Sequence, residues 1–142
     1  MPKPNTPLLT VDAVILINDK KDLVLIRRKN PPFQGELALP GGFVDIGEIV
    51  EEACIREAFE ETNINVKILK IIGVFSDPKR DPRGHTVSIA FLCEPQTKNE
   101  KPKAKDDAVA IEVIALKYVS SLKLAFDHKE IIKSSGILNN FN

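Results

Sequence analysis

Three glutamates, Glu57, Glu60 and Glu61, stand at positions i, i+3 and i+4 of one segment of the chain. This spacing places the three side chains on one face of a helix. Carboxylates that close repel each other, so we expect a positive charge to hold them together. Hard divalent cations such as Mg²⁺ take oxygen ligands and usually keep a substrate phosphate in their coordination shell. The spacing therefore predicts a metal site for phosphate chemistry.

The segment around these glutamates resembles the signature of Nudix pyrophosphohydrolases, Gly-x5-Glu-x7-Arg-Glu-U-x-Glu-Glu-x-Gly-U, in which U is a bulky apolar residue. The chain fits it without insertion or deletion at Gly42, Glu48, Arg56, Glu57, Glu60, Glu61 and Ile64. Ala58 is smaller than the usual apolar residue, and Asn63 replaces the glycine that ends the helix in a left-handed conformation. Asparagine tolerates that conformation next best, so we expect a loss of stability with little effect on the chemistry.

The resemblance implies a role for each matching residue. It makes Glu57, Glu60 and Glu61 the metal ligands, together with the backbone carbonyl of Gly41, and it makes Mg²⁺ the cofactor, with Mn²⁺ as an alternative. Glu48 supports the metal site in this scheme, and Arg56 orients a ligand carboxylate, a role that suits its planar fork of donors. A solvated face is the usual fate of a glutamate-rich helix, but the accompanying Gly41-Gly42, Glu48 and Arg56 favour the metal site.

The general base is open at this stage. In many Nudix enzymes an acidic residue on a late loop helps to take the proton from water. We expect Asp107 in this role, with Asp106 and Glu112 as alternatives. A plain solvated pair of charges is an equally good interpretation of Asp106 and Asp107.

The loop 76–88 follows the motif and is rich in arginine and proline. It resembles the corresponding loop of ADP-ribose pyrophosphatases, a Nudix subgroup, in which a proline beyond the motif accompanies ADP-ribose preference. The resemblance implies cleavage of ADP-ribose to AMP and ribose 5-phosphate. Arginine side chains are suited to binding phosphates. The chain has no tryptophan, so a phenylalanine ring would have to stack on adenine. The substrate-binding residues that we expect are Arg28, Arg80, Arg83, Gly42 and Phe75, with Phe33 and Phe43 as alternative rings.

Two rival functions remain. The first keeps the chemistry and changes the substrate to an ordinary or oxidised nucleoside triphosphate, or to another nucleoside-diphosphate sugar. The second is a non-hydrolysing module that binds ADP-ribose.

Size and charge limit the remaining possibilities. The 142 residues suit one domain, residues 1–142. Basic and acidic residues number 20 each, so we expect neither a nucleic-acid partner nor a membrane surface as partner. Two cysteines, Cys54 and Cys93, do not make a disulfide framework, and we expect both to be buried, inert thiols in a cytoplasmic protein. The resemblance also implies a homodimer.

The pattern of apolar residues predicts the elements that must position these groups. We expect strands at 8–17, 23–26, 36–39, 66–75, 86–92 and 112–119. Helices are expected at about 49–62 and at about 128–135, the second with a capping box formed by Asp127 and Glu130. Strands and helices do not alternate regularly. This favours an α+β fold with a mixed sheet between helices, which is also the α/β/α sandwich of Nudix proteins.

Overall fold

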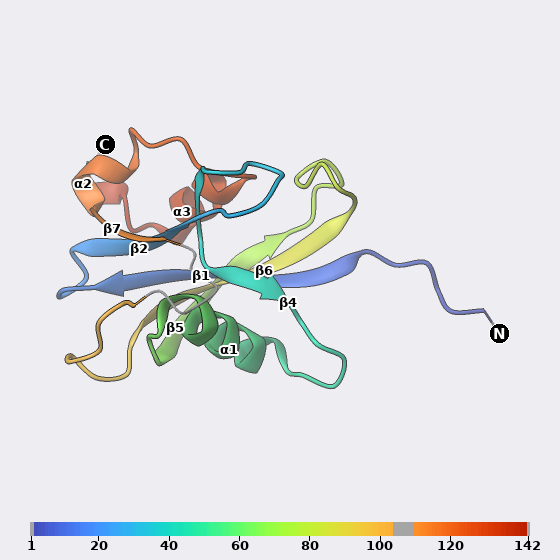
Figure 1. Ribbon diagram of the computed structural model, residues 1–142, viewed down its shortest axis with the longest axis horizontal. Coiled ribbons are helices and arrows are strands. Elements are labelled where there is room, and N and C mark those ends of the chain that lie inside the picture. The colour runs from blue at the N-terminus through green and yellow to red at the C-terminus, as the bar shows by residue number, and fades with distance from the viewer. Residues whose placement is uncertain (1, 104–109, 142) are drawn as a thin grey trace.

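The computed structural model describes residues 2–103 and 110–141. Within these residues seven strands form a mixed sheet, and helices lie on both of its sides (Figure 1). The elements are β1 (Leu8–Ile17), β2 (Asp22–Arg27), β3 (Leu37–Ala38), β4 (Gly41–Phe43), α1 (Val50–Thr62), β5 (Val66–Phe75), β6 (Thr86–Pro95), β7 (Ile111–Ala115), α2 (Leu116–Val119), α3 (His128–Ser135) and the 3-10 turn η1 (Asn139–Phe141).

The sheet is built around β1. Its central order is β3-β2-β1-β6-β5, with β4 also paired to β1 and β7 to β2. The β1–β6 pair is parallel and the other pairs are antiparallel. The α+β prediction with a mixed sheet between helices is therefore confirmed.

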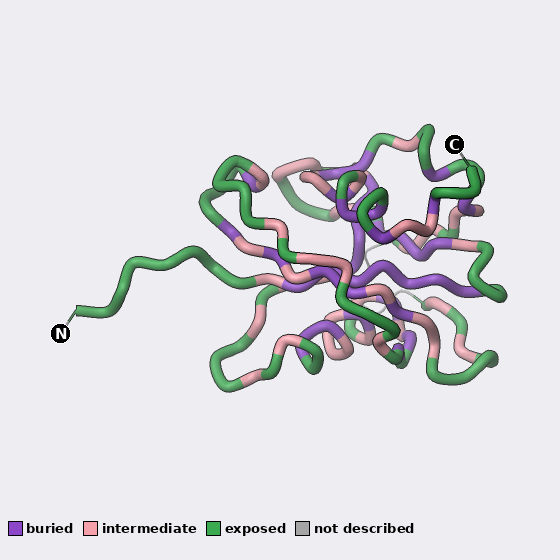
Figure 2. The backbone as a smooth tube through the Cα atoms, turned by 180° about the vertical axis from the view of Figure 1, so that it is seen from behind, coloured by how far each residue is buried: buried purple, intermediate pink, exposed green. Residues whose placement is uncertain are grey.

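Successive side chains of β1 alternate between two hydrophobic cores, as expected for a strand covered on both faces. Val11, Ala13 and Ile15 belong to the core beneath α1. Val14 and Leu16 belong to the core that also contains residues of α2 and α3. Figure 2 shows the resulting continuous buried stretch along β1. This strand is therefore a rigid base for any polar residue that it carries.

Helix α1 ends as the sequence predicts. Asn63 adopts a left-handed conformation with φ of 63°, and its backbone N–H donates to the carbonyl of Phe59 at 2.9 Å. Ala58 is fully buried against the sheet, so the small residue lets the helix pack closely. The two cysteines are buried free thiols with their Sγ atoms 3.8 Å apart. This confirms the expectation of buried thiols.

Two of the expected element boundaries were wrong. The expected strand 112–119 ends at Ala115, and a short helix, α2, follows. A short apolar run does not distinguish a strand from a buried helical turn, and here Leu116 and Val119, three residues apart, both reach the core. No strand was expected directly after 36–39, but Gly41–Phe43 pairs with β1 as β4.

The capping box at α3 is absent from the structure. Asp127 is the N-cap residue but forms no side-chain cap hydrogen bond. Its carboxylate accepts hydrogen bonds from Arg80 instead. A tertiary ion pair has thus replaced the local interaction that the sequence suggested.

None of the helices in residues 2–103 and 110–141 has the length and apolar composition needed to span a bilayer.

Candidate active site

A cavity of about 210 Å³ lies where β1, β4, α1, the 76–84 loop and the start of α3 meet. Its lining includes seven of the residues named from sequence, namely Arg28, Gly41, Gly42, Glu61, Arg80, Arg83 and the alternative ring Phe43. It also includes Asp12, Asp81, Phe126 and His128, which the sequence did not single out as site residues. Basic and acidic side chains therefore face one cavity from separate parts of the chain.

Glu61 is the α1 glutamate that lines this cavity. Its Oε1 accepts a hydrogen bond from the backbone N–H of Gly41 at 3.2 Å. Desolvation, with a smaller contribution from the nearby carboxylates of Glu57 and Asp12, raises the pKa of Glu61 to about 8. Burial disfavours the ionised form of this carboxyl, and a nearby cation would favour it.

The two glycines of β4 allow close contact with two carboxylates. A Cβ atom on Gly42 would lie 2.6 Å from both carboxylate oxygens of Glu57, and one on Gly41 would lie 2.6 Å from Oδ1 of Asp12. Both distances are shorter than van der Waals contact allows. At Gly41 a Cβ would also clash with the backbone carbonyl of Val11, so the space available requires glycine there. At Gly42 a Cβ would displace the carboxylate of Glu57 from its present place.

Arg56 is the centre of a network of carboxylates at the edge of this site. Its Nε and Nη2 donate to the two oxygens of Glu48 at 2.7 and 3.0 Å. Its Nη1 donates to Glu57 at 2.8 Å and to Glu60 at 3.2 Å. The Nη2 group also donates to the carbonyl of Phe43 at 3.0 Å, which ties α1 to β4. The hydrogen bonds from Arg56, followed by one from the backbone of Asp45, lower the pKa of Glu48 to about 2.

Arg80 forms a second arginine network, with partners from β1, β6 and the residue before α3. Its Nε and Nη2 donate to the carboxylate of Asp127 at 2.9 and 2.7 Å, and its Nη1 donates to Thr86 at 3.1 Å. Asp12 lies 3.8 Å from Nη2. The Arg80 side chain is only 5% exposed. Although Arg80 lines the cavity as expected, protein acceptors hold its guanidinium.

Asp12 connects this network to the strands. Ser88 donates to its Oδ2 at 2.5 Å, and Nε2 of His128 lies 3.4 Å from its Oδ1. The Nδ1 atom of His128 accepts the backbone N–H of Leu39 at 2.9 Å, so Nε2 carries the ring proton and faces Asp12. Burial lowers the pKa of His128, which favours this neutral form. The only sequence signal for Asp12 is an acidic residue inside an apolar strand.

Residues 6–134 match the family profile of the NUDIX domain. The chain belongs to the Nudix family. It is thus a Nudix hydrolase, an enzyme that acts on pyrophosphate bonds.

Known Nudix proteins resemble this chain along nearly its whole length. It is 48% identical over 127 residues to the ADP-ribose pyrophosphatase of Methanocaldococcus jannaschii, covering 89% of this chain and 72% of the relative. It is 34% identical over 140 residues to the ADPR responsive transcriptional repressor NtrR of Acinetobacter baylyi, covering 95% of this chain and 56% of the repressor.

Solved structures share the fold. The NUDIX domain of Shewanella oneidensis NrtR complexed with ADP ribose superimposes with a TM-score of 0.82 at 28% identity, covering 93% of this chain and 88% of that one. A bifunctional NMN adenylyltransferase/ADP ribose pyrophosphatase from Francisella tularensis, complexed with AMP and a Mn ion, gives 0.78 at 32% identity, covering 96% and 42%.

Nudix hydrolases generally use a divalent metal, and the donor chemistry of this chain fits one. The carboxylates of Glu57 and Glu61 are hard oxygen donors, and burial raises the pKa of both. Among the described residues, however, no three acidic, histidine or cysteine side chains are already gathered as a metal site. Arg56 supplies the positive charge beside Glu57 and Glu60, whereas Glu61 faces Gly41 and the cavity.

Other expected residues of the Nudix site lie away from the cavity. Phe75, at the end of β5, packs against the core that contains α3 residues and does not line the cavity. Glu112, an alternative base, accepts a hydrogen bond from Nε of Arg27 at 2.6 Å. Asp106 and Asp107 lie outside the described residues.

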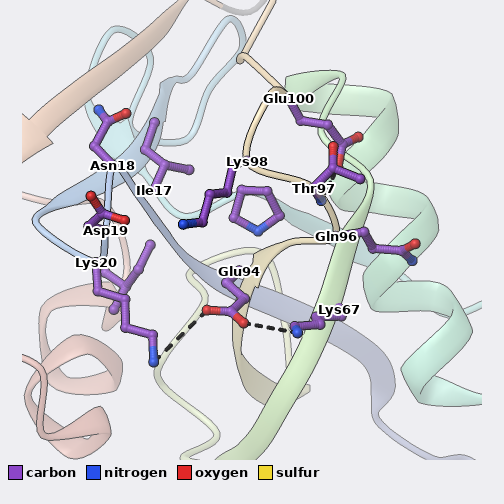
Figure 3. Close-up of a pocket in the computed structure, with 12 residues that line it drawn as sticks. Ile17, Asn18, Asp19, Lys20, Lys67, Glu94, Gln96, Thr97, Lys98 and Glu100 are labelled. Atoms are coloured by element: carbon purple, nitrogen blue, oxygen red, sulfur yellow. Dashed lines mark hydrogen bonds and ion pairs between the residues drawn. The ribbon is translucent and has the colours of Figure 1, made fainter.

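A larger cavity, of about 620 Å³, lies at the other end of β1, near the turn after Ile17. Glu94 pairs there with Lys20 at 3.9 Å and with Lys67 at 3.2 Å (Figure 3). None of the site residues expected from the Nudix motif lines this cavity. We therefore assign the chemistry to the smaller cavity beside α1.

Proposed function

We propose that this Nudix hydrolase cleaves ADP-ribose to AMP and ribose 5-phosphate, with Mg²⁺ as its metal and Mn²⁺ as an alternative. The observation that carries the proposal is the lining of one cavity by Glu61 and by Arg28 and Arg83. Carboxylates for a cation and guanidinium groups for phosphate are both needed to bind a diphosphate. The similarity to the archaeal ADP-ribose pyrophosphatase supports the choice of substrate.

Glu57, Glu60, Glu61 and the carbonyl of Gly41 would hold the cation. When bound, such a cation neutralises phosphate charge and lowers the pKa of a coordinated water. Hydrolysis adds one water to the diphosphate: a new oxygen–phosphorus bond forms while the bond to the bridging oxygen breaks. We retain Asp107 as the group that takes the water proton.

The remaining residues of the chain orient these groups. Arg56 holds Glu57 and Glu60 through hydrogen bonds and is itself held by Glu48. Gly42 leaves room for the carboxylate of Glu57. Asp127 and Thr86 already accept hydrogen bonds from the Arg80 guanidinium. We therefore propose that Arg80 positions other residues and does not contact the substrate directly. Phe75, the adenine contact expected from sequence, lies on β5 outside the cavity, so an adenine that stacks on it would have to extend beyond the cavity.

We also propose that the protein is a homodimer. The edge strand β5 exposes Leu69, Ile71 and Val74, which are 38%, 56% and 59% exposed. An apolar edge strand favours pairing with another chain. Sedimentation equilibrium should give twice the chain mass, and Ile71→Glu should shift it toward one chain; a wild-type monomer would remove this part of the proposal.

A binding module is the second candidate, because the repressor NtrR matches 95% of the chain. The chain spans only about half the length of that repressor, and the carboxylates of the Nudix motif are all present. The complete set of motif carboxylates favours hydrolysis.

A turnover panel tests the proposal. ADP-ribose, other nucleoside-diphosphate sugars, dinucleoside polyphosphates and nucleoside triphosphates are each incubated with the protein and Mg²⁺, with EDTA as control. The expected result is AMP plus ribose 5-phosphate, with ADP-ribose preferred. A preference for triphosphates would rule out ADP-ribose as the main substrate. Binding of ADP-ribose without turnover of any compound would favour the binding module.

A further inference from the structure

Phe126 occupies an unusual position in the wall of the candidate active site. It lies just before Asp127 and has a left-handed backbone with φ of 53°. A bulky residue adopts this conformation only when the surrounding structure imposes it, and such residues concentrate at functional sites. Phe33, also left-handed with φ of 59°, packs edge-on against the Phe126 ring with centroids 4.8 Å apart. The ring is therefore held firmly at the cavity.

Two guanidinium groups contact this one ring. The Arg28 guanidinium carbon lies 4.8 Å from the ring centroid, and that of Arg83 lies 5.7 Å from it. The negative face of an aromatic ring attracts cations within about 6 Å. Arg28 directly follows β2, and Arg83 lies in the 76–84 loop. Phe126 is therefore a contact shared by two separate parts of the chain.

Other contacts fix the two arginines without neutralising both. Arg83 donates from Nε and Nη2 to the two oxygens of Asp81 at 3.1 and 2.8 Å. Arg28 donates from Nε to the neutral carbonyl of Pro32 at 2.7 Å. Burial lowers the pKa of Arg28, and the next largest cause is the positive charge of Arg83. The two groups therefore repel each other and leave positive charge at the cavity.

We propose that Phe126 is a positioning residue that holds Arg28 and Arg83 together as one binding site for the diphosphate of the substrate. The ring offsets the repulsion between the guanidinium groups before an anion arrives. Glu61 lines the same cavity, so a diphosphate bound by the arginines lies beside the α1 glutamates. The inference rests on the proposed function for its substrate class, but its test does not depend on turnover.

The test is calorimetric binding of ADP and of adenosine to the full chain and to variants. Phe126→Leu removes the ring face and should weaken ADP binding about tenfold, which lies within the range for cation–ring contacts. Adenosine, which lacks phosphate, should bind unchanged. Phe126→Tyr keeps the ring and should restore ADP binding. Tyr118→Leu is the matched control, because Lys117 lies 5.1 Å over the Tyr118 ring outside this cavity.

A double-mutant cycle separates positioning from packing. If Phe126 acts through the arginines, Arg83→Gln should weaken ADP binding less in the Phe126→Leu background than in the wild type. Phe126→Met fills similar space with a flexible side chain and replaces Phe126→Leu if the latter does not fold. Equal weakening of ADP and adenosine, or additive effects in the cycle, would overturn the inference while leaving the proposed function in place. A wild type that binds no ADP would also overturn the inference, whereas the turnover panel decides the proposed function separately.

Discussion

The Arg56 and Arg80 networks use the same chemistry in two different settings. Arg56 binds Glu48, Glu57 and Glu60, which lie within eight residues of it, and its side chain is 30% exposed. Arg80 binds Asp127, 47 residues away, and its side chain is 5% exposed. Exposed ion pairs contribute little to stability and can exchange partners, whereas buried pairs are costly to break. The comparison indicates that Arg56 holds the carboxylates that we propose as part of the metal site, and that Arg80 joins the parts of the fold that surround them.

The largest expected effect on stability is at Arg80. Arg80→Met leaves the Asp127 carboxylate without its partner and should lower the free energy of unfolding by about 3 kcal/mol. Urea denaturation measures this loss. Arg27→Met is the matched control, because Arg27 pairs with Glu112 on the surface and should cost less than about 1 kcal/mol. Equal losses in the two variants would remove the distinction between the networks.

Arg56→Lys should show the opposite pattern. Lysine keeps the charge but cannot contact Glu48, Glu57 and Glu60 with one planar fork. Misplaced carboxylates should lower kcat for ADP-ribose roughly 10²-fold. The urea midpoint should change little, since the network is partly exposed. A variant with normal kcat and a large loss of stability would mean that Arg56 is structural.

His128 extends the Arg80 network to the backbone of Leu39. His128→Ala leaves that buried N–H without an acceptor and should cost about 1–3 kcal/mol. Burial lowers the pKa of His128, so the unfolded chain binds the proton more readily as the pH falls below 6.5. Wild-type stability should therefore decline from pH 6.5 downward, and this part of the decline should vanish in His128→Ala. His85→Ala, at an exposed position, is the control. The same slope in the wild type and in His128→Ala would contradict a buried, neutral His128.

The smallest effect is expected at Glu48. Its pKa is lowered from 4.5 to about 2, mainly by Arg56, so its contribution is complete above pH 4.5 and lost as the pH falls toward 2. Glu48→Gln should therefore lose less in Tm between pH 5 and pH 3 than the wild type does. Glu52→Gln, at an exposed position of α1, should follow the wild type. A Glu48→Gln profile that matches Glu52→Gln would show that the pair contributes nothing measurable.

The two networks also differ in how much of them the sequence predicts. Of the partners of Arg56, Glu60 follows from helix spacing, because residues four apart are neighbours on a helix. Glu48 and Glu57 follow from their places in the Nudix signature. The end of α1 is also predictable, because asparagine tolerates the left-handed conformation that ends a helix, and Asn63 adopts it. The sequence therefore predicts α1 and the residues beside it well.

The Arg80 network could not be predicted in this way. Ser88 lies 76 residues from Asp12, and Leu39 lies 89 residues from His128. Such contacts depend on the parallel pairing of β1 with β6 and on the packing of α3, not on local pattern. The same tertiary interactions took Asp127 away from its expected cap and made a strand of the glycines at β4.

Turnover of Glu61→Gln as a function of Mg²⁺ concentration tests the central claim most directly, namely that the α1 glutamates beside the cavity bind the catalytic cation. Glutamine keeps the shape of Glu61 and removes its charge. We predict a loss of roughly 10²-fold or more in kcat for ADP-ribose, with the fold intact by circular dichroism and with Glu52→Gln unchanged. Near-wild-type turnover in Glu61→Gln at every Mg²⁺ concentration would contradict the claim.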